Sequence, residues 1–318
     1  MSKLYALGEL LIDFQSEGHG GLKETERFVK KAGGAPANVV AQAAKLGCET
    51  YYLTKVGNDG FGDFLIESLI AINVDVHYIQ KDDEHPTSLA FVSIREDGER
   101  EFSFYRQNAA DLMIDPSDFE GVKFEKSDVF EFGSVALASR ESRKTHDALI
   151  QKAKEAGASI AFDPNLRLNL WKDVELLKNL VKEYAAKADI IKIGKDELEF
   201  VTGKTENEGV KELLALGVKL LLLTDGSKGA KLFVKDRVYH CPGYKVKAVD
   251  ATGAGDSFFG AFLACLISSG VAKENYETDK LPCQTMLDFA CKAGAYTTTG
   301  YGAIPSMGNA EQIERKVS

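Results

Sequence analysis

The sequence has few cysteines and no long apolar run, and both shortages exclude classes of protein. No stretch approaches the ~20 consecutive apolar residues that a membrane-spanning helix needs. Residues 1–14 include Glu9 and Asp13 and lack a cleavage site, so we expect neither a signal peptide nor a membrane partner. The cysteines are odd in number and contain no CxxC pair, which argues against a disulfide framework or a zinc site and predicts a cytoplasmic protein; they are Cys48, Cys241, Cys265, Cys283 and Cys291.

Positive charge is also in short supply. The chain has 39 Lys and Arg residues against 48 Asp and Glu residues, a net charge of −9. Sequence-independent binding to nucleic acid needs many cationic contacts to phosphates, so we expect no nucleic-acid partner. A nucleotide is still compatible with this charge, because local cations, backbone N–H groups and a metal ion suffice to hold its phosphates.

What the sequence does contain is an alternation of strand-like and helix-like segments, which predicts an α/β fold with a largely parallel sheet. Residues 4–14 are predicted as the first strand, and residues 36–46 as a helix with Pro36 in its first turn and Gly47 past its end. Further strands are predicted at 51–56, 129–132, 159–162, 190–193 and 220–223, and a second helix at 61–70.

One region departs from this alternation. Residues 87–94 and 100–105 are rich in β-forming residues and are separated by a turn containing Asp97-Gly98, which predicts a hairpin. With partner strands from residues 14–30, this hairpin would form a small β lid over the carboxyl ends of the main sheet. An antiparallel edge of the main sheet is the alternative interpretation. No internal repeat or linker is present, so we expect one domain over residues 1–318, with a lid from about 14–30 and 86–106 inserted in it.

The strongest local motif runs from Asp250 to Asp256 (DATGAGD) and precedes an apolar helical run. A Gly-Ala-Gly turn at the start of a helix presents unpaired backbone N–H groups at the positive end of the helix dipole, which favours an anion such as phosphate. Asp256 is then a candidate general base, although taken alone it is equally compatible with a helix N-cap. A second cluster, residues 33–38 (GGAPAN), is compatible with a ligand-binding turn that places Asn38 near a hydroxyl-rich substrate, or with a plain turn.

Familiar nucleotide fingerprints are absent. Gly203-Lys204-Thr205 imitates the end of a P-loop, but Leu198 occupies the required upstream glycine position. Gly253 and Gly255 begin a GxGxxG pattern whose third glycine position holds Phe258. Other polar candidates lie where predicted strands end, at the edge where open α/β sheets bind ligands: Asp13, Asp163 to Arg167, and Thr224 to Gly226.

Taken in order, these segments resemble the PfkB (ribokinase-like) family of carbohydrate kinases over nearly the whole chain. Residues 33–38 match the family's N-terminal signature and residues 250–256 its C-terminal one. Similarity to the fructokinase subgroup is carried by residues 8–14, 102–106, 110–112, 162–167 and 302–305. The resemblance implies a three-layer α/β/α core with a β lid, and an ATP-dependent kinase that phosphorylates the 6-hydroxyl of D-fructose. A 2-keto-3-deoxygluconate kinase, a ribokinase and a non-catalytic sugar or nucleotide sensor are the alternatives.

The resemblance also implies residue roles. Asp256 is the base, assisted by the N–H groups of Gly253, Ala254 and Gly255 and by Arg167. Sugar contacts fall to Asp13, Gly33, Gly34, Asn38, Phe104, Arg106, Asp163 and Asn165, and nucleotide contacts to Lys192, Thr224, Gly226, Gly229, Gly253 and Gly255. Family members use Mg²⁺, which Glu197 would organise through water, and many are activated by K⁺ at the loop of Asp250 and Thr252 and the segment near 300–303.

Two positions depart from the family pattern, and the lid has a second implied use. Gly194 stands where the Asn-x-x-Glu motif usually has its Asn, and Cys291 stands where many fructokinases have an adenine-side Asn. Lids of this family can serve as dimer interfaces, which implies a homodimer as a partner state beside the sugar and ATP.

Overall fold

The computed structural model describes residues 2–94 and 100–317, and within them the main sheet has nine strands. Their order is β13-β12-β11-β10-β9-β8-β1-β4-β5, and the pairs from β11 through β5 are parallel, while β12 and β13 extend one edge antiparallel. The bounds are β1 Lys3–Leu7, β4 Glu49–Gly57, β5 Ile79–Asp82, β8 Val129–Gly133, β9 Ser159–Asp163, β10 Ile190–Gly194, β11 Leu220–Thr224, β12 Ala230–Val234 and β13 Arg237–Cys241. The predicted parallel α/β sheet is confirmed; the β12–β13 hairpin was not predicted.

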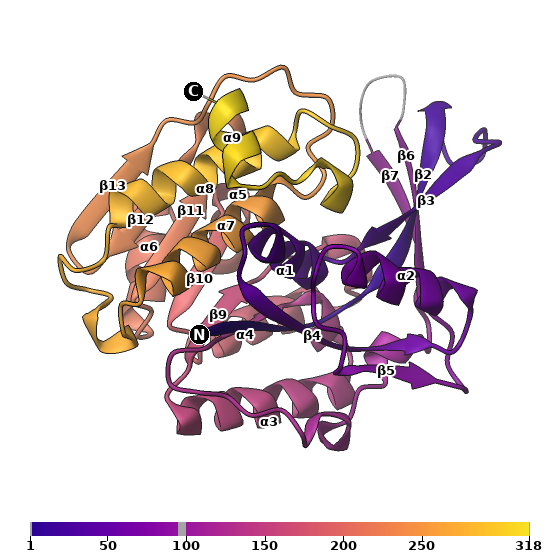
Figure 1. Ribbon diagram of the computed structural model, residues 1–318, viewed down its shortest axis with the longest axis horizontal. Helices are drawn as coiled ribbons and strands as arrows, with labels where there is room; N and C mark the ends of the chain where they lie inside the picture. Colours follow the sequence, from indigo (N-terminus) through magenta and orange to yellow (C-terminus); the bar gives the residue numbers. More distant parts are fainter. Residues whose placement is uncertain (1, 95–99, 318) are drawn as a thin grey trace.

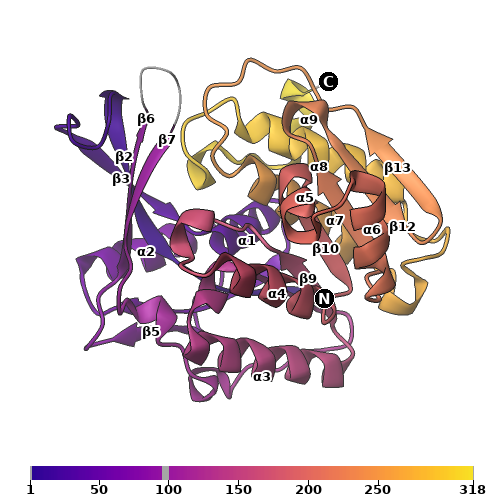
Figure 2. The ribbon, with the colours of Figure 1, turned by 180° about the vertical axis from the view of Figure 1, so that it is seen from behind.

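Helices cover both faces of this sheet, so the core has three layers (Figures 1 and 2). Helices α1, α2, α7 and α8 pack on one face in one apolar cluster, and α3, α4, α5 and α6 pack on the other face in a second. The helices are α1 Ala35–Lys45, α2 Gly60–Ile70, α3 Arg140–Ala156, α4 Val174–Ala185, α5 Lys195–Thr202, α6 Glu206–Ala215, α7 Ala254–Ser269, α8 Cys283–Thr297 and α9 Ala310–Lys316. Short 3₁₀ helices are η1 Ala110–Leu112, η2 Pro116–Phe119, η3 Val135–Ala138, η4 Leu168–Leu170, η5 Gly226–Lys228, η6 Lys273–Asn275 and η7 Ile304–Ser306.

A separate four-stranded sheet forms the lid, which stands away from the core in Figure 1. Its order is β3-β2-β6-β7, with bounds β2 Leu11–His19, β3 Phe28–Gly33, β6 Ser88–Ile94 and β7 Arg100–Tyr105. The predicted lid is confirmed, and the alternative of an edge on the main sheet is wrong. The lid begins at Leu11 and extends to Gly33, beyond the predicted 14–30. The predicted turn at Asp97-Gly98 lies outside the described residues.

The prediction of one strand over residues 4–14 is wrong, because the chain leaves the main sheet after Leu7 and enters the lid at Leu11. Two side chains of β4 hold the crossing: the Thr54 hydroxyl donates to the carbonyl oxygen of Gly8 (2.7 Å), and the Tyr52 hydroxyl donates to that of Glu9 (2.6 Å). Gly8 and Glu9 are weak strand formers and so hint at a break, but the change of sheet itself depends on these tertiary contacts and could not be seen in the sequence.

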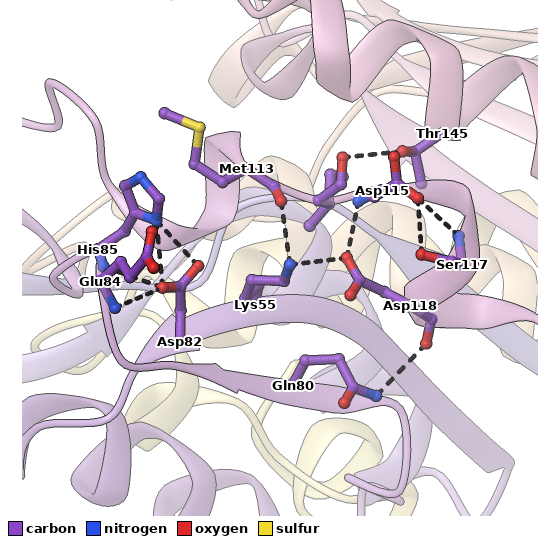
Figure 3. A network of polar contacts seen from close by, with 11 residues as sticks. Lys55, Gln80, Asp82, Glu84, His85, Met113, Asp115, Ser117, Asp118 and Thr145 are labelled. Carbon is purple, nitrogen blue, oxygen red and sulfur yellow. Dashed lines mark hydrogen bonds and ion pairs between the residues drawn. The ribbon is translucent and has the colours of Figure 1, made fainter.

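Polar contacts also fix the segments that enter and leave the lid (Figure 3). Before β6, the Asp82 carboxylate accepts hydrogen bonds from the backbone N–H groups of Glu84 (2.8 Å) and His85 (2.9 Å). After β7, the Lys55 ammonium donates to the carbonyl oxygen of Met113 (3.0 Å) and pairs with Asp118 (2.9 Å). The segments before β6 and after β7 are therefore fixed next to the edge strand β5 and its neighbour β4.

Among the described residues, no helix combines the length and the apolar character required to cross a membrane.

Candidate active site

Two glycine-containing turns meet where α1 and α7 begin. Helix α7 crosses close to α1, since a Cβ on Gly260 would lie 2.3 Å from the carbonyl oxygen of Val39. At their first turns, Asn38 Nδ2 donates a hydrogen bond of 2.8 Å to Asp256 Oδ2. The N-cap of α7 is Gly253, and Asp256 is the third residue of the helix. The interpretation of Asp256 as a helix cap is therefore wrong, and its carboxylate is turned to Asn38.

The turn before α1 requires glycine at position 34 and is closely packed at position 33. Gly34 has φ 122°, in the region that favours glycine, and a Cβ there would lie 2.1 Å from the carbonyl oxygen of Glu9. A Cβ on Gly33 would lie 2.2 Å from Asp13 Oδ2. Residues 33 and 34 thus allow the α1 turn, the Asp13 carboxylate and the Glu9 backbone to pack together.

A cavity of about 310 Å³ opens between this turn and the lid, and most of the predicted catalytic and sugar-contact residues line it. The lid contributes Asp13 and Phe104, the core contributes Asn38, Asn165 and Arg167, and Asp256 lies at its wall. The other predicted residues on the lining are Gly34, Lys192, Thr252, Gly253 and Gly255. We call this space the sugar cavity.

Three buried polar atoms on the walls of the sugar cavity have no hydrogen-bond partner within the described part of the chain. They are Glu9 Oε2, Asn38 Oδ1 and Asn165 Nδ2. Buried polar atoms are almost always paired in folded proteins, so atoms left free on a cavity wall mark positions where a ligand or water completes them. Two acceptors and one donor suit hydroxyl groups, each of which both donates and accepts.

Three predicted sugar contacts do not line the sugar cavity. Gly33 lies beneath the Asp13 carboxylate, as described above. The Asp163 carboxylate is buried and accepts a hydrogen bond of 2.8 Å from the Lys192 ammonium. The Arg106 guanidinium is buried against Asp111. Lys192 itself lines the sugar cavity and nears the α7 turn, since a Cβ on Gly255 would lie 3.1 Å from its Nζ.

A second cavity, of about 630 Å³, lies on the other side of the α7 turn. It contains the predicted nucleotide residues Thr224, Gly226 and Gly229 together with Ala254 and Gly255, and Cys291 lines it from α8. Ala251 and Gly255 line both cavities, so the two spaces meet at the start of α7. Lys192 lies on the sugar side and not in this nucleotide cavity.

The two segments predicted to hold a monovalent cation are joined through Asp250. Its Oδ1 accepts hydrogen bonds from the N–H (3.0 Å) and hydroxyl (2.6 Å) of Thr252, and its Oδ2 accepts one of 2.8 Å from the N–H of Gly302. The two segments therefore lie together in the structure, and the Asp250 carboxylate links them through hydrogen bonds. Cation binding by their carbonyl groups stays a prediction.

The carboxylates of Glu197 and Asp163 fit a hydrated Mg²⁺. Glu197 Oε2 accepts from the N–H of Gly194 (2.8 Å) and Oε1 from the N–H of Leu166 (2.9 Å), so each oxygen keeps a lone pair for a metal-bound water. Asp163 Oδ1 is buried without a partner in the described chain. Mg²⁺ commonly keeps several waters and takes one or two carboxylates plus substrate phosphates, which matches this donor set. Gly194, which stands where the family motif usually has Asn, orients Glu197 through its backbone N–H.

Burial sets the protonation of the site's acids. It raises the pKa of Asp256 above its ordinary value, against the opposing effects of the Lys192 charge, the Asn38 hydrogen bond and the Arg167 charge. Burial likewise raises the pKa of Asp13 to about 6, although the Arg167 charge lowers it. Removal from water is the largest of the influences on the pKa of Asp256.

Several residues of the sugar cavity were not predicted: Glu9, Leu11, Gln15, Val92, Phe102, Val135 and Leu170. A signal existed for four of them. Leu11 and Gln15 alternate with Asp13 along β2, and Phe102 alternates with Phe104 along β7; residues two apart in a strand share a face. Glu9 was visible as an acid inside an apolar run. Val92, Val135 and Leu170 come from separate elements, and no local pattern connects them.

Comparison with known proteins identifies the class of protein that carries this site. The family model described as "pfkB family carbohydrate kinase" matches residues 1–310. Fructokinase-2 of Solanum lycopersicum is 40% identical over 312 residues, covering 97% of this chain and 94% of that protein. The crystal structure of the fructokinase from Vibrio cholerae O395 in its fructose, ADP and calcium ion bound form superposes with a TM-score of 0.90 at 32% identity, covering 100% of this chain and 99% of the other. A variant of that enzyme in its fructose, ADP and potassium ion bound form also has a TM-score of 0.90, at 31% identity with the same coverage.

The fold is thus that of a ribokinase-like carbohydrate kinase. The chain belongs to the pfkB family, as its sequence resemblance implied.

The raised pKa of Asp13 predicts a pH-dependent stability effect. Between pH ~4 and ~6 the unfolded chain has lost the Asp13 proton while the folded chain retains it, so folding stability falls as pH rises through this window. We expect Asp13→Asn to increase the free energy of unfolding of the ligand-free protein at pH 7 by about 1–3 kcal/mol. The gain should disappear near pH 4. Urea denaturation at several pH values checks this, with Asp63→Asn on the exposed face of α2 as control; a gain that is constant with pH would contradict it.

Proposed function

We propose that this chain is an ATP-dependent fructokinase that transfers the γ-phosphoryl group to the 6-hydroxyl of D-fructose, with Asp256 as the base. The observation that carries the proposal is the junction of the two cavities at the start of α7, with Asp256 on the sugar side. An acceptor in one cavity and a nucleotide in the other would meet at the N–H groups of the Gly253–Gly255 turn. The similarity to fructokinases, including structures with fructose and ADP, supports the choice of sugar.

The residues at the junction supply what phosphoryl transfer requires, namely positioning and charge stabilisation. Asp256 is held by Asn38 and would accept the proton of the sugar hydroxyl. The N–H groups of Gly253, Ala254 and Gly255, together with Arg167 and Lys192, would offset negative charge on the transferring group. When bound, Mg²⁺ supplies further neutralisation of the phosphates, organised through Glu197.

The lid has a part in this proposal because two of its strands line the sugar cavity. Asp13 and Phe104 reach the cavity from β2 and β7. Movement of the lid over the sugar would exclude water and limit hydrolysis of ATP. We also propose that residues 1–318 work as one kinase domain, in a reducing cytoplasm; the absence of disulfides among the five cysteines supports that location.

A substrate panel tests the choice of sugar. We expect ADP release with D-fructose to exceed that with ribose, mannose or 2-keto-3-deoxygluconate, and to rise when K⁺ is added, because the Asp250 and Gly302 segments are joined where a cation would act. Na⁺ at equal ionic strength is the control for K⁺. Faster turnover of ribose or of the sugar acid would favour the corresponding alternative kinase. Binding of fructose and ATP without ADP release would favour the sensor.

Replacement of the base separates chemistry from binding. We expect Asp256→Ala to lower kcat by about 10²–10⁴-fold or more, because proton removal from the hydroxyl loses its acceptor. Calorimetry should show fructose affinity within about tenfold of the original, since the other wall residues remain. The exposed Asp63→Asn serves as control for both measurements. A kcat close to that of the unchanged protein would remove Asp256 from the mechanism.

A homodimer through the lid is a further proposal. Val29 and Phe102 are 42% and 41% exposed and lie on one face of the lid, in the cross-strand row Val29-Gln15-Val92-Phe102, whereas Tyr105, 64% exposed, is on the opposite face. Exposed apolar side chains on one face commonly mark an interface. We expect sedimentation equilibrium to give a dimer mass, and Val29→Glu to give a monomer, because a charge would be buried in the interface. Val238→Glu on the exposed edge strand β13 is the matched control. A monomer mass for the unchanged protein would refute this.

A further inference from the structure

Arg106 stands behind the wall of the sugar cavity with its charge already satisfied. The side chain is 7% exposed, and both Nε (2.9 Å) and Nη2 donate to Asp111 Oδ2. Its Nη1 donates to the carbonyl oxygen of Val135 (3.3 Å), and Val135 and Glu9 line the cavity in front of it. Burial lowers the pKa of the guanidinium, but the charges of Asp111 and Glu9 raise it more, so Arg106 keeps its charge.

Asp111 is held firmly in this position. It is 1% exposed, and its Oδ1 accepts a hydrogen bond of 2.5 Å from the Ser88 hydroxyl at the start of β6. Its helical turn, η1, is anchored on both sides: Ala110 N–H donates to the carbonyl oxygen of Pro86 (2.9 Å), and the Lys55 ammonium donates to that of Met113 (Figure 3). Turning Arg106 towards the cavity would leave Asp111 buried and unpaired, which is costly.

On the lid side of the sugar cavity, the acids Glu9 and Asp13 disfavour a ligand that carries a carboxylate of its own. Glu9 Oε2 is free on the wall, and Asp13 lies beside it on the first lid strand. A sugar acid placed there would bring its carboxylate against these acids without a free cation from Arg106. Arg167 and Lys192 also line the cavity, but Lys192 is paired with Asp163 and, in the proposed function, both cations face the transferring phosphoryl group. A neutral sugar adds no negative charge, and its hydroxyls can satisfy the hydrogen-bonding groups of the wall.

We propose that Asp111 determines substrate class: by holding the Arg106 guanidinium it restricts the sugar cavity to neutral sugars and excludes sugar acids. The proposal rests on the sugar kinase function proposed above and concerns the same cavity. Asp111 acts through Arg106 and does not itself touch the substrate.

The test is a gain of binding by Asp111→Asn. The amide keeps the shape of the carboxylate but removes its charge, so Arg106 becomes able to pair with a ligand carboxylate. Binding of D-fructose and of 2-keto-3-deoxygluconate is measured by calorimetry, and turnover of each by ADP release. We expect the unchanged protein to bind the sugar acid at least ~100-fold more weakly than fructose, and Asp111→Asn to bind it about 10- to 100-fold more tightly, the range of a hydrogen-bonded charge pair.

The double variant Asp111→Asn, Arg106→Gln should lose this gain, whereas Asp147→Asn on the exposed face of α3 should show none. If Asp111→Asn melts below the assay temperature, Ser88→Ala replaces it; this variant keeps both charges and loosens Asp111, and we expect a smaller gain in sugar-acid affinity. Equal affinity of the unchanged protein for both ligands, a gain that survives in the double variant, or no gain in either folded variant would overturn the proposal. Absence of fructose turnover would instead refute the kinase function, while the calorimetric comparison would still decide the selection by charge.

Discussion

The hydrogen bond between Asn38 and Asp256 joins the two halves of the site, and the rest of the arrangement depends on it. It links residues 218 positions apart in the chain, at the first turns of two helices that cross closely at Gly260. Each of these turns contains glycines, so backbone N–H groups without neighbouring side chains come together where the two helices begin. The sugar cavity lies on one side of this point and the nucleotide cavity on the other.

Burial around this point concentrates opposite charges in little space. Lys192 pairs with Asp163 beneath the α7 turn, and the charges of Asp163, Glu197 and Asp256 raise the pKa of Lys192 above its ordinary value although burial acts to lower it. Burial also raises the pKa of Asp163 to about 7, which the Lys192 charge only partly opposes. The site therefore combines one firmly charged ammonium with carboxyl groups whose protons are released more readily when further positive charge arrives with the metal ion.

The sequence was a good guide where local chemistry decides the structure and a poor one where distant segments meet. The parallel strands and helix α1 were predicted because apolar runs, Pro36 and Gly47 act locally. The split of the first strand was missed, since it depends on the hydroxyls of Tyr52 and Thr54 in another strand. Motif residues such as Asp256 and Asn38 were found, whereas Val135 and Leu170 reach the sugar cavity through tertiary packing alone. Arg106 pairs with Asp111, five residues further along the chain, only because the chain turns at η1. No local pattern in the sequence predicts this pairing.

At its amino end, the lid is joined directly to the first strand of the core by the crossing from β1 to β2. Only Gly8, Glu9 and Leu10 separate a strand fixed in the core from one that belongs to the lid, and the sugar cavity takes Glu9 from the crossing and Asp13 from the lid strand. A ligand that contacts both Glu9 and Asp13 therefore bridges the connection between core and lid. If the bound ligand favours one position of the lid, thermodynamic linkage requires that this lid position raises the affinity for the ligand by the same factor. Sugar binding and closure of the lid would therefore stabilise each other.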